Sequence, residues 1–250
     1  MTISARDIDH LSLTLSDPDA AAARLQQLGF TLTPEGGDSR CLCLEPMGDD
    51  VPAYIELIAG DPPGVAVALN VAKAEGELRT YSWETEDGAQ IDAEVVVGET
   101  GGPVPWFAVQ HQTPDAFTEP EWVVHPNGAL ALMAVHAVAE QPKPLAATLA
   151  KAWKGEVDEI FDGCVVVRTG SVEFFLWSVS AWQSEYKAIE AMAPEQKPAI
   201  VGVSVAVERA RPLQALLRAN NVPFAVAEGD RVLTAPEHSG GLLFEFVPQN

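Results

Sequence analysis

Histidines are the side chains in this chain best suited to chemistry, because a neutral imidazole binds metal ions and exchanges protons near neutral pH. The chain has five of them. The first, His10, lies in the stretch Ile8–Leu15, where polar residues alternate with leucines. This period of two predicts a β-strand with its leucines on one face and His10 on the other. The strand therefore presents one imidazole on a face that the core does not occupy.

A helix is predicted directly after this strand. Asp17 is suited to accept the free amide hydrogens of a first helical turn, and Pro18 is suited to a first helical position. Gly29 is typical of the left-handed residue that follows a last turn. These signals predict that a helix between Asp17 and Gly29 positions the histidine-bearing strand against a core.

The order strand, helix and further strands recurs along the chain, which indicates an internal repeat. We expect four βαβββ modules, at residues 6–60, 64–114, 129–180 and 199–250. The second module is the least regular, with its helix expected at 72–80 and its last strand at 106–111. Each module leaves one sheet face uncovered, so the modules must pair to close a core.

Two lobes follow from this pairing, and the predicted fold class is α+β with curved mixed sheets. The N-terminal lobe covers residues 1–114, a connection covers 115–128, and the C-terminal lobe covers 129–250 with a helical insert at 181–198. The sequence favours pairing of consecutive modules, while pairing of the first with the last remains an alternative.

The composition limits the kinds of molecule that this protein can bind. The chain has 250 residues, is 47% hydrophobic and carries a formal net charge of −21, so it would be repelled by nucleic acids and anionic membranes. Three cysteines without a CxxC pair favour neither a disulfide scaffold nor a structural zinc site. With no signal peptide and no apolar stretch near the ~20 residues that cross a bilayer, we expect a cytoplasmic protein that binds a small molecule, with a homodimer as one option for its assembly.

Several segments resemble the vicinal oxygen chelate superfamily, which includes glyoxalases, bleomycin-resistance proteins and extradiol dioxygenases. They are Ile8-Asp9-His10-Leu11 before the proline-capped helix, Tyr54-Ile55-Glu56-Leu57-Ile58, and the ending Leu242 to Pro248. The first half is most similar to the glyoxalase-like domain group. The resemblance covers nearly the whole chain and implies concave sheets in which two paired modules hold one divalent metal ion.

The resemblance also implies which residues would bind that ion. In the first module they are His10 and Glu56, both suited to zinc, iron, manganese or nickel. In the second module Ala66 stands at the first position, so His111 would have to complete the set. A shift of the strand by one residue would turn Gln110 inward in its place.

Structural roles are the alternative for these residues. His10 could be hydrogen-bonded within the sheet, and Glu56 could be paired with an arginine such as Arg40. His125 precedes a Pro-Asn-Gly turn and either positions the chain or lines the pocket mouth, and Trp106 either packs in the core or stacks on a ligand. In the C-terminal lobe, His136 and Glu245 are expected to form a hydrogen-bonded core pair without metal.

The sequence thus predicts a site in the N-terminal lobe, with His10 and Glu56 as catalytic residues, His10, Glu56 and His111 as metal ligands, and Trp106, Gln110 and His125 at the pocket. The activity expected is that of a divalent-metal-dependent lyase, isomerase or dioxygenase. A metal-free protein that binds or sequesters a small molecule is an equal alternative.

Overall fold

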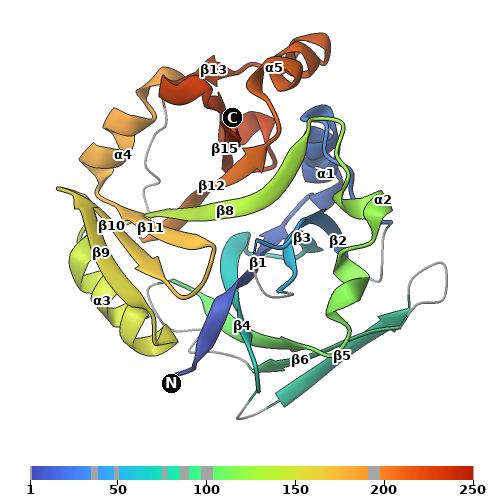
Figure 1. Cartoon of the computed structure of the whole chain (residues 1–250), viewed down its shortest axis with the longest axis vertical. Helices are drawn as coiled ribbons and strands as arrows, with labels where there is room; N and C mark the ends of the chain where they lie inside the picture. The colour runs from blue at the N-terminus through green and yellow to red at the C-terminus, as the bar shows by residue number, and fades with distance from the viewer. Residues whose placement is uncertain are drawn as a thin grey trace.

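The computed structural model describes residues 2–34, 39–47, 51–74, 78–84, 90–96, 104–190 and 198–249. Within these residues the strands form two mixed sheets (Figure 1). Sheet A has the strand order β2-β3-β1-β4-β7-β6-β5, and sheet B the order β13-β14-β15-β12-β8-β11-β10-β9. Both sheets are curled and carry few helices. The predicted α+β class with curved mixed sheets is therefore confirmed.

Sheet A is built from residues in the first half of the chain. Its strands are β1 (Ala5–Leu15), β2 (Ser39–Leu44), β3 (Ala53–Ala59), β4 (Gly64–Val71), β5 (Leu78–Glu84), β6 (Gln90–Val96) and β7 (Trp106–His111). Helix α1 (Pro18–Gln27) follows β1, and the 3-10 helix η1 (Pro114–Phe117) and helix α2 (Pro120–Val123) follow β7.

Sheet B is built from residues in the second half. Its strands are β8 (Ala129–Val138), β9 (Glu156–Phe161), β10 (Cys164–Arg168), β11 (Glu173–Trp177), β12 (Ala199–Val207), β13 (Ala225–Val226), β14 (Val232–Thr234) and β15 (Leu243–Pro248). Its helices are α3 (Pro142–Trp153), α4 (Val179–Glu185) and α5 (Ala210–Ala219). The lobe boundaries at residues 114, 128 and 129 stay a prediction.

The first strand and helix form as their sequence predicts. Leu11 and Leu13 are buried in the main core, whereas His10 and Ser12 lie on the opposite face of β1. Asp17 caps α1, because its Oδ1 accepts the Ala20 amide hydrogen at 2.9 Å. Gly29 ends the helix with a φ of 86°, a conformation that favours glycine.

The second module departs from the predicted pattern. The helix expected at 72–80 is not formed, because residues 78–84 are strand β5, paired antiparallel with β6. Thr80, Tyr81 and Trp83 are residue types that favour strands, and pairing with β6 outweighs the helix signal of the residues before them. Residues 75–77 of the predicted helix lie outside the described part of the chain.

Two other predictions change in detail. Residues 30–33, expected as a short strand, have no regular structure, although the Thr33 amide donates to the Cys41 carbonyl oxygen at 2.9 Å. The helical insert begins at Val179 rather than at 181, and the 3-10 helix η2 (Lys187–Ile189) follows it. Its residues 191–197 are outside the described part. No helix among the described residues is long and apolar enough to cross a membrane.

Consecutive modules lie side by side in each sheet. In sheet A, β1 pairs antiparallel with β4, and in sheet B, β8 pairs antiparallel with β12. Leucines of β1 share one buried cluster with residues of α3, α5 and β15, so the two sheets bury their helix-covered faces together. The opposite, concave faces remain for other uses.

Asp7 ties the two sheets together at the start of β1. Its buried carboxylate accepts the amide hydrogens of Ser171 and Val172, at 2.7 and 2.9 Å, from the turn between β10 and β11. A Cβ atom added at Gly170 would collide with Asp7, so this turn approaches β1 as closely as glycine permits. Burial raises the pKa of Asp7, although these amides lower it.

We expect Asp7→Ala to lower the free energy of unfolding by about 2 to 4 kcal/mol, because it leaves buried amide hydrogens without an acceptor. The control is Asp17→Ala, which removes one exposed helix cap and should cost about 1 kcal/mol. Urea unfolding at neutral pH measures both. A loss no larger than that of the control would show that Asp7 does not hold the sheets together.

Candidate functional site

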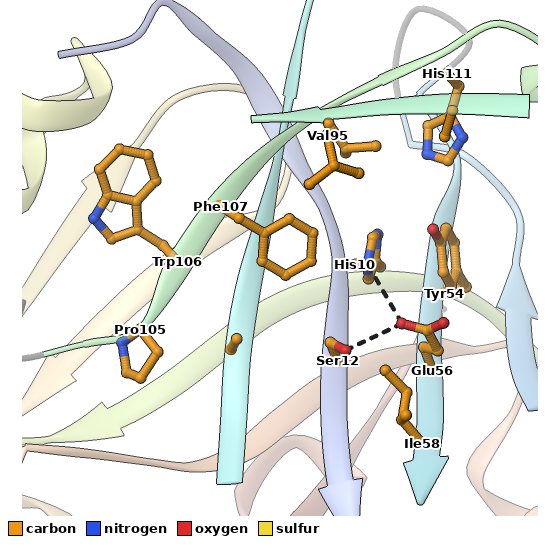
Figure 2. Close-up of a pocket in the computed structure, with 13 residues that line it drawn as sticks. His10, Ser12, Tyr54, Glu56, Ile58, Val95, Pro105, Trp106, Phe107 and His111 are labelled. Atoms are coloured by element: carbon orange, nitrogen blue, oxygen red, sulfur yellow. Dashed lines mark hydrogen bonds and ion pairs between the residues drawn. The ribbon is translucent and has the colours of Figure 1, made fainter. Parts of the chain in front are cut away.

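A cavity of about 300 Å³ opens on the concave face of sheet A (Figure 2). Its polar end is formed by His10, Ser12 and Glu56, whose side chains point toward one another from β1 and β3. The remaining wall is mainly apolar and aromatic. It is made by Tyr54, Ile58, Ala66, Ala93, Val95, Pro105, Trp106, Phe107 and Val109, with His111 at one side. Small-molecule sites have this composition, with few polar groups in an apolar hollow.

Asp9 fixes the orientation of His10. The register between β1 and its neighbour β4 shifts between Ile8 and His10, which marks a bulge at Asp9. A bulge re-aims a side chain, and the Asp9 carboxylate consequently lies beside His10, with Oδ1 2.7 Å from Nδ1. Because a carboxylate only accepts, Nδ1 carries the hydrogen. In the neutral imidazole, Nε2 then carries no hydrogen, and its lone pair is directed at the cavity.

Asp9 also binds His111 and Asn70. Its Oδ1 lies 3.0 Å from His111 Nε2, and its Oδ2 accepts from Asn70 Nδ2 at 2.8 Å. Burial works to raise the pKa of Asp9, but the charges and hydrogen bonds of His111 and His10 outweigh it and lower the pKa to about 2. The fully buried carboxylate is therefore ionised at neutral pH.

Glu56 is the second polar group of the cavity. Ser12 donates to its Oε2 at 3.0 Å, since the two residues are register partners on β1 and β3. The same oxygen lies 3.9 Å from His10 Nε2, too far for a hydrogen bond. The expected pairing with Arg40 is replaced by this contact with Ser12, and Arg40 lies 3.3 Å from Asp19.

Aromatic rings hold the imidazole in place. His10 stacks on Tyr54, with ring centroids 4.1 Å apart, and Tyr54 stacks in turn on Phe117 at 4.6 Å. Phe107 meets the other side of His10 edge-on at 5.4 Å. Phe117 belongs to η1, so the segment after β7 closes this part of the concave face.

Strand β7 keeps the register that turns His111 and Val109 inward. His111 lines the cavity, but its Nε2 is bound to Asp9, and its buried Nδ1 has no hydrogen-bond partner among the described residues. Gln110 lies on the opposite face, where its Oε1 accepts the Ala74 amide hydrogen at 2.8 Å. Strand alternation thus removes Gln110 from the cavity that we expected it to line.

Trp106 and His125 have structural surroundings. Trp106 lies at the cavity wall but is 5% exposed and packs edge-on against Trp153. His125 does not line the cavity, because its Nε2 contacts the Cys43 carbonyl oxygen at 2.8 Å and its Nδ1 accepts the Thr31 amide hydrogen. Burial lowers the pKa of His125, so the ring is held neutral. It positions the chain after α2, one of its two expected roles.

The residues fit a divalent metal ion only in part. His10 Nε2 and Glu56 Oε2 are close enough to share an ion, since ligand bonds of about 2.1 Å reach across 3.9 Å. Catalytic sites ordinarily use three protein ligands, however, and the other half of the concave face offers Ala66, Phe107 and Val109. Asp9, His10 and His111 place ligand atoms within 4.8 Å of one another, but these atoms already hydrogen-bond among themselves.

The sequence did not single out Asp9, Tyr54 or Phe107. The alternation of polar and apolar residues predicts that Asp9 lies on the leucine face of β1. The bulge turns its carboxylate toward His10 instead. Tyr54 and Phe107 could have been found, because each has the parity of a predicted inward residue, Glu56 or His111. The three cysteines carry no chemistry here. They are buried, and burial raises the pKa of the Cys43 and Cys164 thiols to about 12.

Comparisons with known proteins find a similar domain family and similar folds. Residues 8–96 match a family described as glyoxalase-like domain. No curated protein sequence matches the chain. Solved structures similar in fold include a hypothetical protein from Staphylococcus aureus (10% identity, TM-score 0.62, 97% of this chain and 99% of that one).

Two enzymes are also similar in fold. One is the Mn(II)-bound glyoxalase from Novosphingobium aromaticivorans, with 10% identity and a TM-score of 0.57 over 97% of this chain and 82% of that one. The other is a variant of homoprotocatechuate 2,3-dioxygenase from B. fuscum, with 13% identity and a TM-score of 0.61 over 100% and 72%. Residues 8–96 therefore match the glyoxalase-like domain family, and the chain shares its overall fold with these glyoxalase and dioxygenase structures.

Proposed function

We propose that the cavity of sheet A binds a small organic molecule with an apolar or aromatic body and a hydroxyl group of phenol or enol type, and that His10 accepts the proton of this hydroxyl. One observation carries the proposal. The lone pair of His10 Nε2 and the carboxylate of Glu56 face each other at 3.9 Å at the end of an apolar cavity. A ligand hydroxyl placed there can donate its hydrogen to His10.

The chain's own residues account for each part of the proton transfer. The proton moves from the ligand oxygen to His10 Nε2, and its bonding electrons remain on that oxygen. The ionised Asp9 stabilises the imidazolium that forms, because it is already bound to Nδ1. Ser12 keeps Glu56 oriented as the second acceptor. The aromatic walls exclude water and hold the body of the ligand.

A protein that binds the same class of molecule without converting it is the second candidate. The observation that favours it is the second half of the concave face, where Ala66, Phe107 and Val109 provide no acid, base or oxyanion donor. Turnover requires such a group to act on the deprotonated ligand. The superfamily supports a small-molecule role for the cavity and does not decide between the two candidates.

The binding proposal predicts that catechol binds in a saturable manner and that its dimethyl ether binds at least about tenfold more weakly, because the ether has no hydrogen to donate. His10→Gln and Glu56→Gln should each weaken catechol binding by about 10- to 100-fold, because each removes a hydrogen-bond acceptor for the ligand hydroxyl. Isothermal titration calorimetry measures all of these affinities.

Glu185→Gln is the matched control for Glu56→Gln. Glu185 lies in sheet B's part of the chain, and its substitution changes the net charge by the same amount as Glu56→Gln does. Catechol affinity should be unchanged in this variant. Equal binding of catechol and its dimethyl ether would contradict the role of His10, and equal weakening by all three substitutions would contradict the location of the site.

Metal content tests the three-ligand set of His10, Glu56 and His111. Since His111 is held on Asp9, we expect protein purified without chelator to contain well under one equivalent of zinc, iron, manganese or nickel by mass spectrometry. One equivalent in the wild-type protein, lost in His10→Gln and in His111→Gln, would establish the metal-dependent enzyme instead.

Asp9→Asn tests the group behind His10. An amide places a donor against Asn70 or an imidazole, so we expect a loss of about 2 to 4 kcal/mol in urea unfolding at pH 7. The folded-state pKa of Asp9 is about 2, below its ordinary 3.8. Its contribution is therefore complete above pH 4 and falls away between pH 4 and 2, so the two proteins should converge in stability on acidification. The exposed Asp19→Asn is the control, and an equal effect of the two substitutions would contradict the buried role of Asp9.

A further inference from the structure

A second cavity, of about 330 Å³, lies on the concave face of sheet B. It is the structural counterpart of the first. Ser12 and Glu56 are register partners on β1 and β3, and Ser204 and Glu245 are register partners on β12 and β15. In both cavities the serine donates to the glutamate. The surroundings of this shared pair differ, however, and they determine a different ligand.

The histidine of this cavity offers no lone pair. Trp177 Nε1 donates to His136 Nδ1 at 3.1 Å, so the hydrogen of the neutral ring is on Nε2, which lies 2.7 Å from Ser204 Oγ. Burial lowers the pKa of His136 to about 4, which keeps the ring neutral. His136 Nε2 therefore donates to Ser204, and the ring neither binds a metal ion nor accepts a proton. His136 and Glu245, expected from the sequence as a hydrogen-bonded pair, are bridged by Ser204, with 3.7 Å between His136 Nε2 and Glu245 Oε2.

Three donors converge on the carboxylate of Glu245 at the floor of the cavity. Glu245 accepts from Ser204, from Tyr186 and from Arg231, and Arg231 also binds Glu185 at 2.7 Å. Three glutamates, Glu173, Glu185 and Glu245, line the cavity with one arginine. Arg168, outside the lining, partners Glu173. The residues that line the cavity thus carry three carboxylates and one guanidinium, an excess of negative charge.

The walls are aromatic and reach the surface. Phe175 stacks on His136 at 5.4 Å, Trp177 lies 6.0 Å from Phe175, and Phe161 meets Trp177 edge-on at 5.8 Å. At the rim, Phe161 is 46% exposed and Ile160 is 45% exposed. Both residues belong to the edge strand β9. Large apolar side chains that are exposed to solvent around a cavity indicate a binding site.

We propose that this cavity binds an organic ammonium ion that carries an aromatic or aliphatic body. The positive group would lie near Glu185 and Glu245 and balance the excess of negative charge there, while the body would lie against Phe161, Phe175 and Trp177. Aromatic faces attract cations. This assignment is independent of the function proposed for sheet A.

The test is isothermal titration calorimetry of the full chain at pH 7.5 with three probes of similar shape and different charge. They are 2-phenylethylamine, 2-phenylethanol and 3-phenylpropanoate. We expect one saturable amine site per chain and an affinity at least about tenfold higher than for the alcohol or the anion. No saturable binding of the amine, or equal affinity for all three probes, would overturn the proposal.

Variants locate the site. Glu185→Gln should weaken amine binding at least about fivefold, whereas the exposed Glu208→Gln, with the same change of charge, should leave it within about twofold. Glu56→Gln should also leave it unchanged, because Glu56 is in the other cavity. If Glu185→Gln fails to fold, as judged by circular dichroism, Phe161→Ser replaces it, because this side chain is half exposed and its loss should weaken the amine similarly. Equal effects of the Glu185 and Glu208 substitutions, or loss of binding in Glu56→Gln, would refute the assignment.

Discussion

The ionised carboxylate of Asp9 is the interaction on which the site in sheet A depends. It is fully buried, and it is stable there because His10, His111 and Asn70 all bind it. One buried charge thereby sets the hydrogen positions of two imidazoles and connects three strands. It gives His10 its cavity-facing lone pair, and it binds Nε2 of His111. Both consequences bear on whether the protein uses a metal ion.

The sequence predicts a large part of the fold, because the fold rests on repeated local patterns. Alternation in residues 8–15, the Asp17 cap and Gly29 predict β1 and α1, and the same order of signals predicts sheet B. The helix expected at 72–80 fails, since the pairing of β5 with β6 is a long-range contact that local helix signals do not contain. Where tertiary pairing decides, sequence patterns of this kind do not suffice.

The site is predicted in its residues but not in its hydrogen bonds. His10 and Glu56 face one cavity, as their strands indicate, and His111 has the inward parity. A bulge of one residue at Asp9 is invisible to alternation, yet it decides which nitrogen of each imidazole is free. In sheet B, likewise, His136 and Glu245 are recognised as a pair, while the tautomer of His136 depends on Trp177, 41 residues away in the chain.

The three cysteines, described above as buried and inert, have a consequence for the handling of reactive molecules. Oxidants and electrophilic carbonyl compounds attack the thiolate, and a thiol with a pKa near 12 is almost entirely protonated at neutral pH. Cys41 and Cys43 lie on the same face of sheet A as the cavity, yet they are enclosed by Tyr54 and Phe117. The folded chain therefore keeps these thiols protonated and enclosed, out of reach of an oxidant or electrophile that enters the cavity.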